Sequence, residues 1–200
     1  MALSDEERKI TAHHEAGHAI LNHFLPESDP NYKCTIIPRG RALGVTVKLP
    51  EVERYNYGKK YLLSEIVVLL GGRVAEEIMF GEQTTGAQND FERSTSMARK
   101  MVTQWGMSEL GPLSFGNGKR DEQVFLGKEL AHQQDYSENT AIEIDRAVRQ
   151  IINECYDQAR TVIETNLDGL KKLAENLLEH ETLVLSQIVE ILGPRPSLSS

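Results

Sequence analysis

Two histidines four residues apart, with a glutamate beside the first, form the segment of this sequence best suited to chemistry. The segment reads His14-Glu15-Ala16-Gly17-His18. On a helix, residues i and i+4 lie on one face, so two imidazoles at this spacing can converge on one metal ion. Glu15 would project next to them as a general base, which is typical of a hydrolytic zinc site. The structural alternative is a pair of packing or surface histidines without a metal.

A catalytic zinc ion needs a third protein ligand and one open position for water. In metzincins the third ligand is a histidine ten residues after the first, but that position here is Phe24. The remaining candidates are carboxylates, namely Glu76, Glu77 and Asp90. Each also has a structural interpretation, because the glutamates could form a charged helix edge and Asp90 could cap a helix. The local sequence leaves these choices open.

The elements that must position these side chains are mostly helices. Ser4 and Glu7 have the spacing of a capping box, which predicts a helix that begins at Asp5 and contains the motif. His13 and His23 lie off the His14/His18 face and are expected to be surface or packing residues. The predicted helices are 5–25, 60–80 with an interruption at Gly71-Gly72, 90–105 with Asn89 or Asp90 as N-cap, a long helix after Ser137, and shorter ones near 167–178 and 186–192.

A small sheet is predicted from two runs rich in β-branched residues, 33–37 and 43–49, separated by a Pro-Arg-Gly turn. An exposed edge there would pair with an extended polypeptide through main-chain hydrogen bonds. The alternative is an interior structural strand. The candidate substrate-binding residues are Leu43, Gly44, Val45, Thr46 and Val47. Residues 111–127 are rich in glycine and are interpreted as an exposed, mobile loop or weak hairpin.

The length and composition predict one globular domain, and the patterns along the chain predict that it is mainly α with a small β-sheet and long C-terminal helices. The 200 residues are 40% apolar, and the net charge of −8 argues against a nucleic-acid-binding surface. We expect a zinc-site part over 1–130 and a helical part over 137–192. Cys34 and Cys155 are far apart in the sequence and are expected to be free thiols. The apolar run from Ile66 to Leu70 is much too short to span a membrane, and the N-terminus does not have the form of a secretion signal.

Several motifs occur in a fixed order, and together they resemble the peptidase domain of the FtsH family, which are membrane-anchored, ATP-dependent zinc proteases. The resemblance covers residues 5–193. The matching segments are His-Glu-Ala-Gly-His-Ala from His14, Ile-Pro-Arg-Gly from Ile37, Ala-Leu-Gly-Val-Thr from Ala42, Leu-Gly-Gly-Arg-Val-Ala-Glu-Glu from Leu70, Thr-Gly-Ala-Gln-Asn-Asp from Thr85, and Met-Val-Thr-Gln-Trp-Gly-Met from Met101.

This resemblance implies a zincin-like helical metalloprotease fold and a specific role for each candidate residue. Zn²⁺ would be held by His14, His18 and Asp90, leaving Glu76 or Glu77 to support a ligating histidine or the structure. Glu15 would take a proton from zinc-bound water as that water attacks a peptide carbonyl group.

The resemblance also implies partners that lie outside this sequence. The family's parent protein carries membrane helices and a P-loop ATPase module, whereas no GxxxxGK[ST] sequence occurs here. We therefore expect an isolated, soluble peptidase module of a homohexameric enzyme on the cytoplasmic side of a bacterial inner membrane, or on an organellar membrane. Its substrates would be unfolded or membrane proteins. Two alternatives are a zinc peptidase that acts without an ATPase and a helical interaction module with a structural metal or none.

Overall fold

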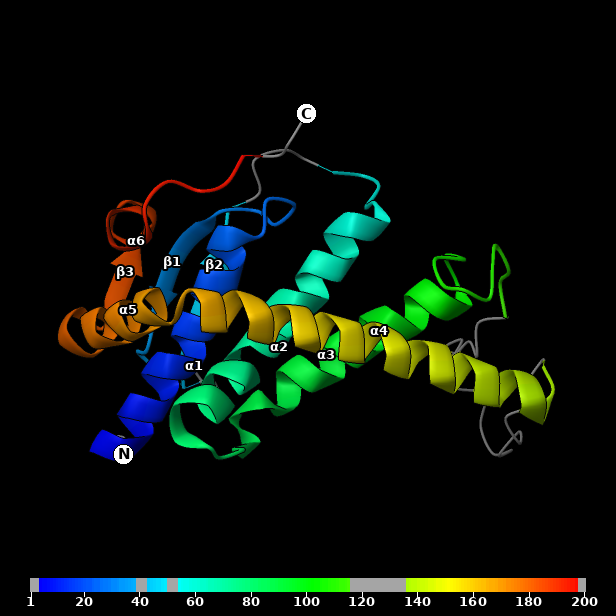
Figure 1. The fold of residues 1–200 in the computed structure, drawn as a ribbon, viewed down its shortest axis with the longest axis horizontal. Helices are drawn as coiled ribbons and strands as arrows, with labels where there is room; N and C mark the ends of the chain where they lie inside the picture. Colours follow the sequence, from blue (N-terminus) through cyan, green and yellow to red (C-terminus); the bar gives the residue numbers. More distant parts are fainter. Residues whose placement is uncertain (1–3, 39–42, 50–53, 116–135, 198–200) are drawn as a thin grey trace, which may run out of the picture.

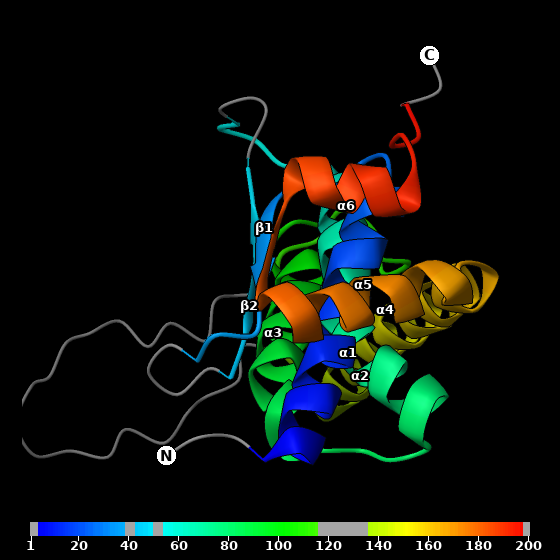
Figure 2. The same ribbon diagram turned by 90° about the vertical axis from the view of Figure 1, so that its left-hand side faces the viewer.

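The computed structural model describes residues 4–38, 43–49, 54–115 and 136–197. These residues form a mainly helical fold with a small antiparallel sheet along one side (Figures 1 and 2). The predicted fold class is therefore confirmed.

Helix α1 (Asp5–Phe24) carries the His-Glu-Ala-Gly-His motif. It starts at the predicted capping box, in which the Ser4 hydroxyl accepts from the Glu7 amide and the Glu7 carboxylate accepts from the Ser4 amide. Leu25 is the C-cap, so the helix ends one residue before the predicted boundary, ahead of Pro26. Nearly every residue from Thr11 to His23 is buried, because α1 packs against α2, α5 and the sheet.

Helix α2 (Lys59–Phe80) runs through Gly71 and Gly72 without a break, so the predicted interruption is wrong. The glycines serve a close helix crossing instead. A Cβ atom on Gly17 would lie 2.4 Å from the carbonyl oxygen of Gly71, which shows that the two backbones approach within a distance that no side chain permits. Helix α2 ends at Gly81, whose left-handed φ of 67° suits glycine.

A short 3₁₀ turn, η1 (Thr85–Ala87), leads directly into α3 (Gln88–Thr103). The helix therefore begins before Asn89, and the prediction of Asn89 or Asp90 as N-cap is wrong. Asp90 lies in the first turn of α3, where its carboxylate is free to point at another element. The long α4 (Glu138–Thr165) begins at Ser137, whose hydroxyl accepts from the Thr140 amide, and packs across α2 and α3 (Figure 1).

The sheet has the strand order β2-β1-β3, with both pairs antiparallel. The strands β1 (Asn31–Thr35) and β2 (Val45–Lys48) lie within or next to the two predicted runs. Strand β3 (Thr182–Val184) was not predicted, since three residues between two helices show no alternation that could be recognised. Among the described residues β2 pairs only with β1, so no described strand covers its other edge.

The C-terminal helices α5 (Leu167–His180) and α6 (Leu185–Leu192) flank β3 and complete the core (Figure 2). One continuous cluster of buried side chains joins all the longer helices to the sheet. Its largest fully buried members are Ile20, Leu21, Ile66, Leu70, Met101, Ile144, Ile163, Leu170, Leu173, Leu177, Leu183 and Ile188.

Both cysteines are buried free thiols, as predicted, and burial raises the pKa of each. Within the described ranges, no helix is both long and apolar enough to cross a bilayer. Residues 111–115 belong to no helix or strand, and the rest of the predicted 111–127 loop lies outside the described residues.

Candidate metal centre

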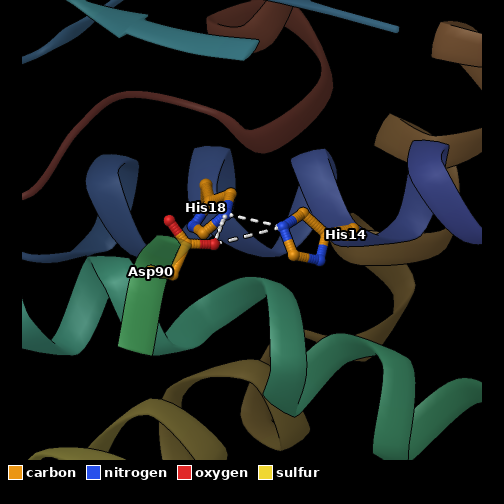
Figure 3. Close-up of side chains that lie close together, drawn as sticks. All are labelled: His14, His18 and Asp90. Carbon is orange, nitrogen blue, oxygen red and sulfur yellow. Dashed lines mark hydrogen bonds and ion pairs between the residues drawn. The ribbon is translucent and has the colours of Figure 1, made fainter. Parts of the chain in front are cut away.

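Three side chains from two helices converge on one point between α1 and α3 (Figure 3). The Nε2 atoms of His14 and His18 are 3.1 Å apart, and Asp90 Oδ2 lies 3.3 Å from the first and 3.2 Å from the second. His18 is buried, and the other two side chains are only 12% and 14% exposed. The structure thus brings together the two motif histidines and Asp90, which is the farthest from them in the sequence among the three carboxylates considered above.

The other ring nitrogen of each histidine already has an acceptor. Nδ1 of His14 donates to Glu76 Oε1 at 2.6 Å, and Nδ1 of His18 donates to the main-chain carbonyl of Val68 at 2.7 Å. These bonds assign the Nδ1-protonated tautomer to both neutral rings and direct both Nε2 lone pairs at the convergence point. Two lone pairs and a carboxylate oxygen facing one another require a cation among them, either a proton or a metal ion.

The geometry fits a tetrahedral zinc ion. Nitrogen and oxygen ligands lie about 2.0–2.2 Å from zinc, and at tetrahedral angles this places them about 3.3–3.5 Å from one another. The separations of 3.1, 3.3 and 3.2 Å are close to that spacing. Because three protein atoms converge among the residues that the structure describes, a fourth position would remain open around the metal, which is the arrangement of a catalytic site.

The electrostatics of the cluster favour a positive charge at its centre. Burial opposes a charge on His14, but its hydrogen bonds to Asp90 and Glu76 outweigh burial and raise its pKa to about 9. For Asp90, burial is likewise outweighed by the bonds to both histidines, which hold its pKa well below the usual range. Zinc would take the place of the proton that the cluster otherwise retains.

Of the two adjacent glutamates, only Glu76 reaches the centre. It is almost fully buried, and its second oxygen, Oε2, accepts from the Thr84 amide at 3.1 Å. Burial raises its pKa, but the bonds from His14 and Thr84 prevail and lower it. Glu76 thereby orients the His14 ring and ties α2 to the segment before α3. Glu77 points to the other side of α2 and binds Tyr156 and Arg160 of α4.

Arg73 and Phe91 support the beginning of α3. The Arg73 guanidinium donates to the Thr84 carbonyl at 2.7 Å and lies 4.8 Å from the centre of the Phe91 ring. These contacts join α2 to both ends of the turn that delivers Asp90. Nothing in the local sequence indicated Thr84 or Val68.

Gly72 leaves the space that the His14 ring occupies. A Cβ atom there would lie 2.3 Å from His14 Cε1 and 2.5 Å from Nε2. We expect Gly72→Ala to displace the ring and weaken zinc binding by more than about tenfold, since disturbing ligand orientation typically costs about 10–100-fold. Competition with a chromophoric chelator measures this affinity. The matched control is Gly58→Ala at the N-cap of the same helix, where an added Cβ atom would have no atom within 4 Å. Equal affinities for both variants would contradict the packing role of Gly72.

The side chain of Glu15 extends from α1 toward strand β2 and is buried. The Thr46 hydroxyl donates to Glu15 Oε2 at 2.7 Å. A Cβ atom on Gly44 would lie 2.8 Å from Oε1, so the chain just before β2 covers the carboxylate closely. Thus the proposed base and the candidate substrate strand are in direct contact, which the sequence did not predict. Leu43 and Gly44 precede the strand itself, which begins at Val45.

The other two histidines of α1 take no part in the centre. His13 is buried, with Nδ1 2.8 Å from the Lys9 carbonyl and its ring against Phe80. His23 is fully buried beside Phe24. Both are packing residues rather than surface residues.

Comparison with known proteins gives matches along nearly the whole chain. Residues 1–191 match the model of peptidase family M41. The chain is 51% identical over 195 residues to an ATP-dependent zinc metalloprotease FtsH of Pelodictyon phaeoclathratiforme, covering 97% of this chain and 29% of the relative. It is 50% identical over 191 residues to the protein of that name from Bacillus subtilis, covering 95% of this chain and 30% of the relative.

A third relative, ATP-dependent zinc metalloprotease FtsH 3 of Symbiobacterium thermophilum, is 50% identical over 199 residues and is matched over 32% of its length. The chain spans about three-tenths of the length of the curated relatives it matches. The family match covers nearly the whole chain, and it includes both helices that carry His14, His18 and Asp90. The chain belongs to peptidase family M41.

Proposed function

We propose that this chain is the proteolytic module of an ATP-dependent zinc endopeptidase. The observation that carries the proposal is the convergence of His14, His18 and Asp90, with the buried side chain of Glu15 on the residue directly after His14. The names of the relatives, which are zinc metalloproteases, support the choice of metal.

In this proposal His14, His18 and Asp90 hold zinc, and Glu15 acts as the general base and then as the general acid. Zinc bound in such a site lowers the pKa of a coordinated water toward about 7 and polarises a carbonyl group. Glu15 accepts a proton from the attacking water and later delivers it to the nitrogen of the leaving amine. Glu76 holds the His14 ring in the required tautomer through its bond to Nδ1.

The edge of β2 that no described strand covers supports a role for residues Leu43 to Val47 in substrate binding. An extended polypeptide added beside β2 would form main-chain hydrogen bonds next to Glu15, because Thr46 of that strand already contacts the carboxylate. Main-chain recognition would give low sequence specificity, which suits a protease that acts on unfolded chains.

The rest of the enzyme is proposed from the relatives. Their names include ATP dependence, and this chain spans only about three-tenths of their length, so we place the ATPase in the remainder of the protein. We further propose a homohexamer anchored to a membrane with this module on the cytoplasmic side, acting on unfolded or membrane proteins.

Removal and return of zinc test the enzymatic proposal. We expect the zinc-loaded chain to hydrolyse unfolded casein, a chelator to lower the rate by more than about 100-fold, and zinc to restore it, because both the nucleophile and the carbonyl group depend on the metal. Hydrolysis is followed by release of labelled peptides, and metal content by elemental analysis. A folded, zinc-loaded chain that cleaves nothing would favour the non-enzymatic interaction module.

A further inference from the structure

The contact between Thr46 and Glu15 joins the two functional parts of the site. Oγ1 of Thr46 is 2.7 Å from Glu15 Oε2, which is the ordinary length of a hydrogen bond from a hydroxyl to a carboxylate oxygen. The main-chain oxygen of Glu15 and the Cys34 sulfur both lie 3.3 Å from the same hydroxyl. A threonine hydroxyl has one proton, and Glu15 Oε2, the nearest of the three acceptors, takes it.

Burial makes this hydrogen bond important for the direction in which the carboxylate points. Glu15 is only 5% exposed, so water cannot easily replace a lost partner. In addition, Gly44 lies against the other oxygen, where a Cβ atom would be 2.8 Å from Oε1. Positions 44 and 46 are two residues apart, so they face the same side of an extended chain. Together they hold the carboxylate from one side.

We propose that Thr46 is a positioning residue, which aims the Glu15 carboxylate through its hydroxyl and so couples the β2 edge to the proton-transferring group. This inference rests on the proposed function. Thr46 pairs with Cys34 in the β1/β2 register, so its main chain is fixed by the sheet while its side chain reaches α1. A polypeptide bound along β2 would therefore lie on the strand that also orients the base.

The test compares Thr46→Val, which keeps the β-branched shape but removes the hydroxyl, with Thr46→Ser, which keeps the hydroxyl. In the zinc-loaded chain, we expect Thr46→Val to lower kcat by about 10–100-fold, with KM and zinc content unchanged. An interaction that aids only the transition state affects kcat in this way. Thr46→Ser should restore most of the rate.

Thr35→Val is the matched control in the same sheet. The Thr35 hydroxyl lies on the β3 side, bound to the Glu181 carbonyl and Thr182 Oγ1 at 3.0 and 2.8 Å. Thr35→Val removes a hydroxyl group from a buried strand residue, so this variant reports the effect of weakening the sheet alone. We expect its kcat to be unchanged.

Crystal structures of the metal-free variants provide a readout that does not depend on activity. The carboxylate should stay within hydrogen-bonding distance of residue 46 in Thr46→Ser and should turn away in Thr46→Val. A Thr46→Val variant with unchanged kcat or an unmoved carboxylate would overturn the positioning role and leave the protease proposal intact. A zinc-loaded unmodified chain without hydrolysis would overturn both.

Discussion

Replacing Glu15 by glutamine is expected to lower kcat for peptide hydrolysis by about 100–10,000-fold, the usual contribution of a general base. Glutamine has the same shape and can still accept a hydrogen bond from Thr46, but it cannot accept a proton from water. Zinc content should remain at one ion per chain, because Glu15 is not among the three converging side chains proposed to hold the metal. Single-turnover hydrolysis of a quenched fluorescent peptide, together with elemental analysis, measures both quantities.

The control for this variant is Glu6→Gln, an exposed acidic residue in the first turn of the same helix. It changes the net charge of α1 equally and should leave kcat unaffected. If Glu15→Gln retained full activity, the assignment of the base would be wrong. If it lost zinc instead, the residue would be part of the metal shell.

Replacing Asp90 by asparagine is expected to weaken zinc binding by more than about 100-fold, since loss of support around ligands alone costs about 10–100-fold. Asparagine preserves the shape of the side chain but supplies a neutral, weaker ligand. The two histidines would then face the metal without the carboxylate that lies 3.3 and 3.2 Å from them. Affinity measured by chelator competition checks the prediction, and hydrolysis should fall in parallel at limiting zinc.

Two variants distinguish this role from a general effect of removing acidic groups. Glu92→Gln removes an exposed carboxylate from the same helix, and Glu77→Gln removes the one that binds Tyr156 and Arg160. Both should retain full zinc affinity. Loss of zinc in Glu77→Gln but not in Asp90→Asn would show that the third ligand has been misassigned.

Local patterns predicted the helices of this protein well. The Ser4/Glu7 capping box set the start of α1, and Pro26 limited its end, because both act through the adjacent backbone. The predicted interruption at Gly71-Gly72 is wrong because local patterns do not include the contact with another helix. Taken alone, two glycines weaken a helix, but here they are stabilised by the partner helix that packs on them.

The start of α3 and the third strand also could not be predicted from local patterns. Asn89 and Asp90 are good capping residues, yet the 3₁₀ turn at Thr85–Ala87 begins the helix earlier and releases Asp90 for the centre. Strand β3 exists because three residues pair with β1 across a long stretch of chain. No periodicity within Thr182–Val184 could reveal that pairing.

By itself, the sequence determined that His14 and His18 share a helix face with Glu15 beside them, because the period of the α-helix is a local property. It did not determine by spacing which carboxylate completes the centre, and the choice of Asp90 came from family resemblance. The tertiary structure decided how the three acids differ: Asp90 reaches both Nε2 atoms, Glu76 reaches only His14 Nδ1, and Glu77 faces α4. Those positions depend on the close crossing of α1 and α2 and on the turn before α3, which arise from packing between segments distant in the chain.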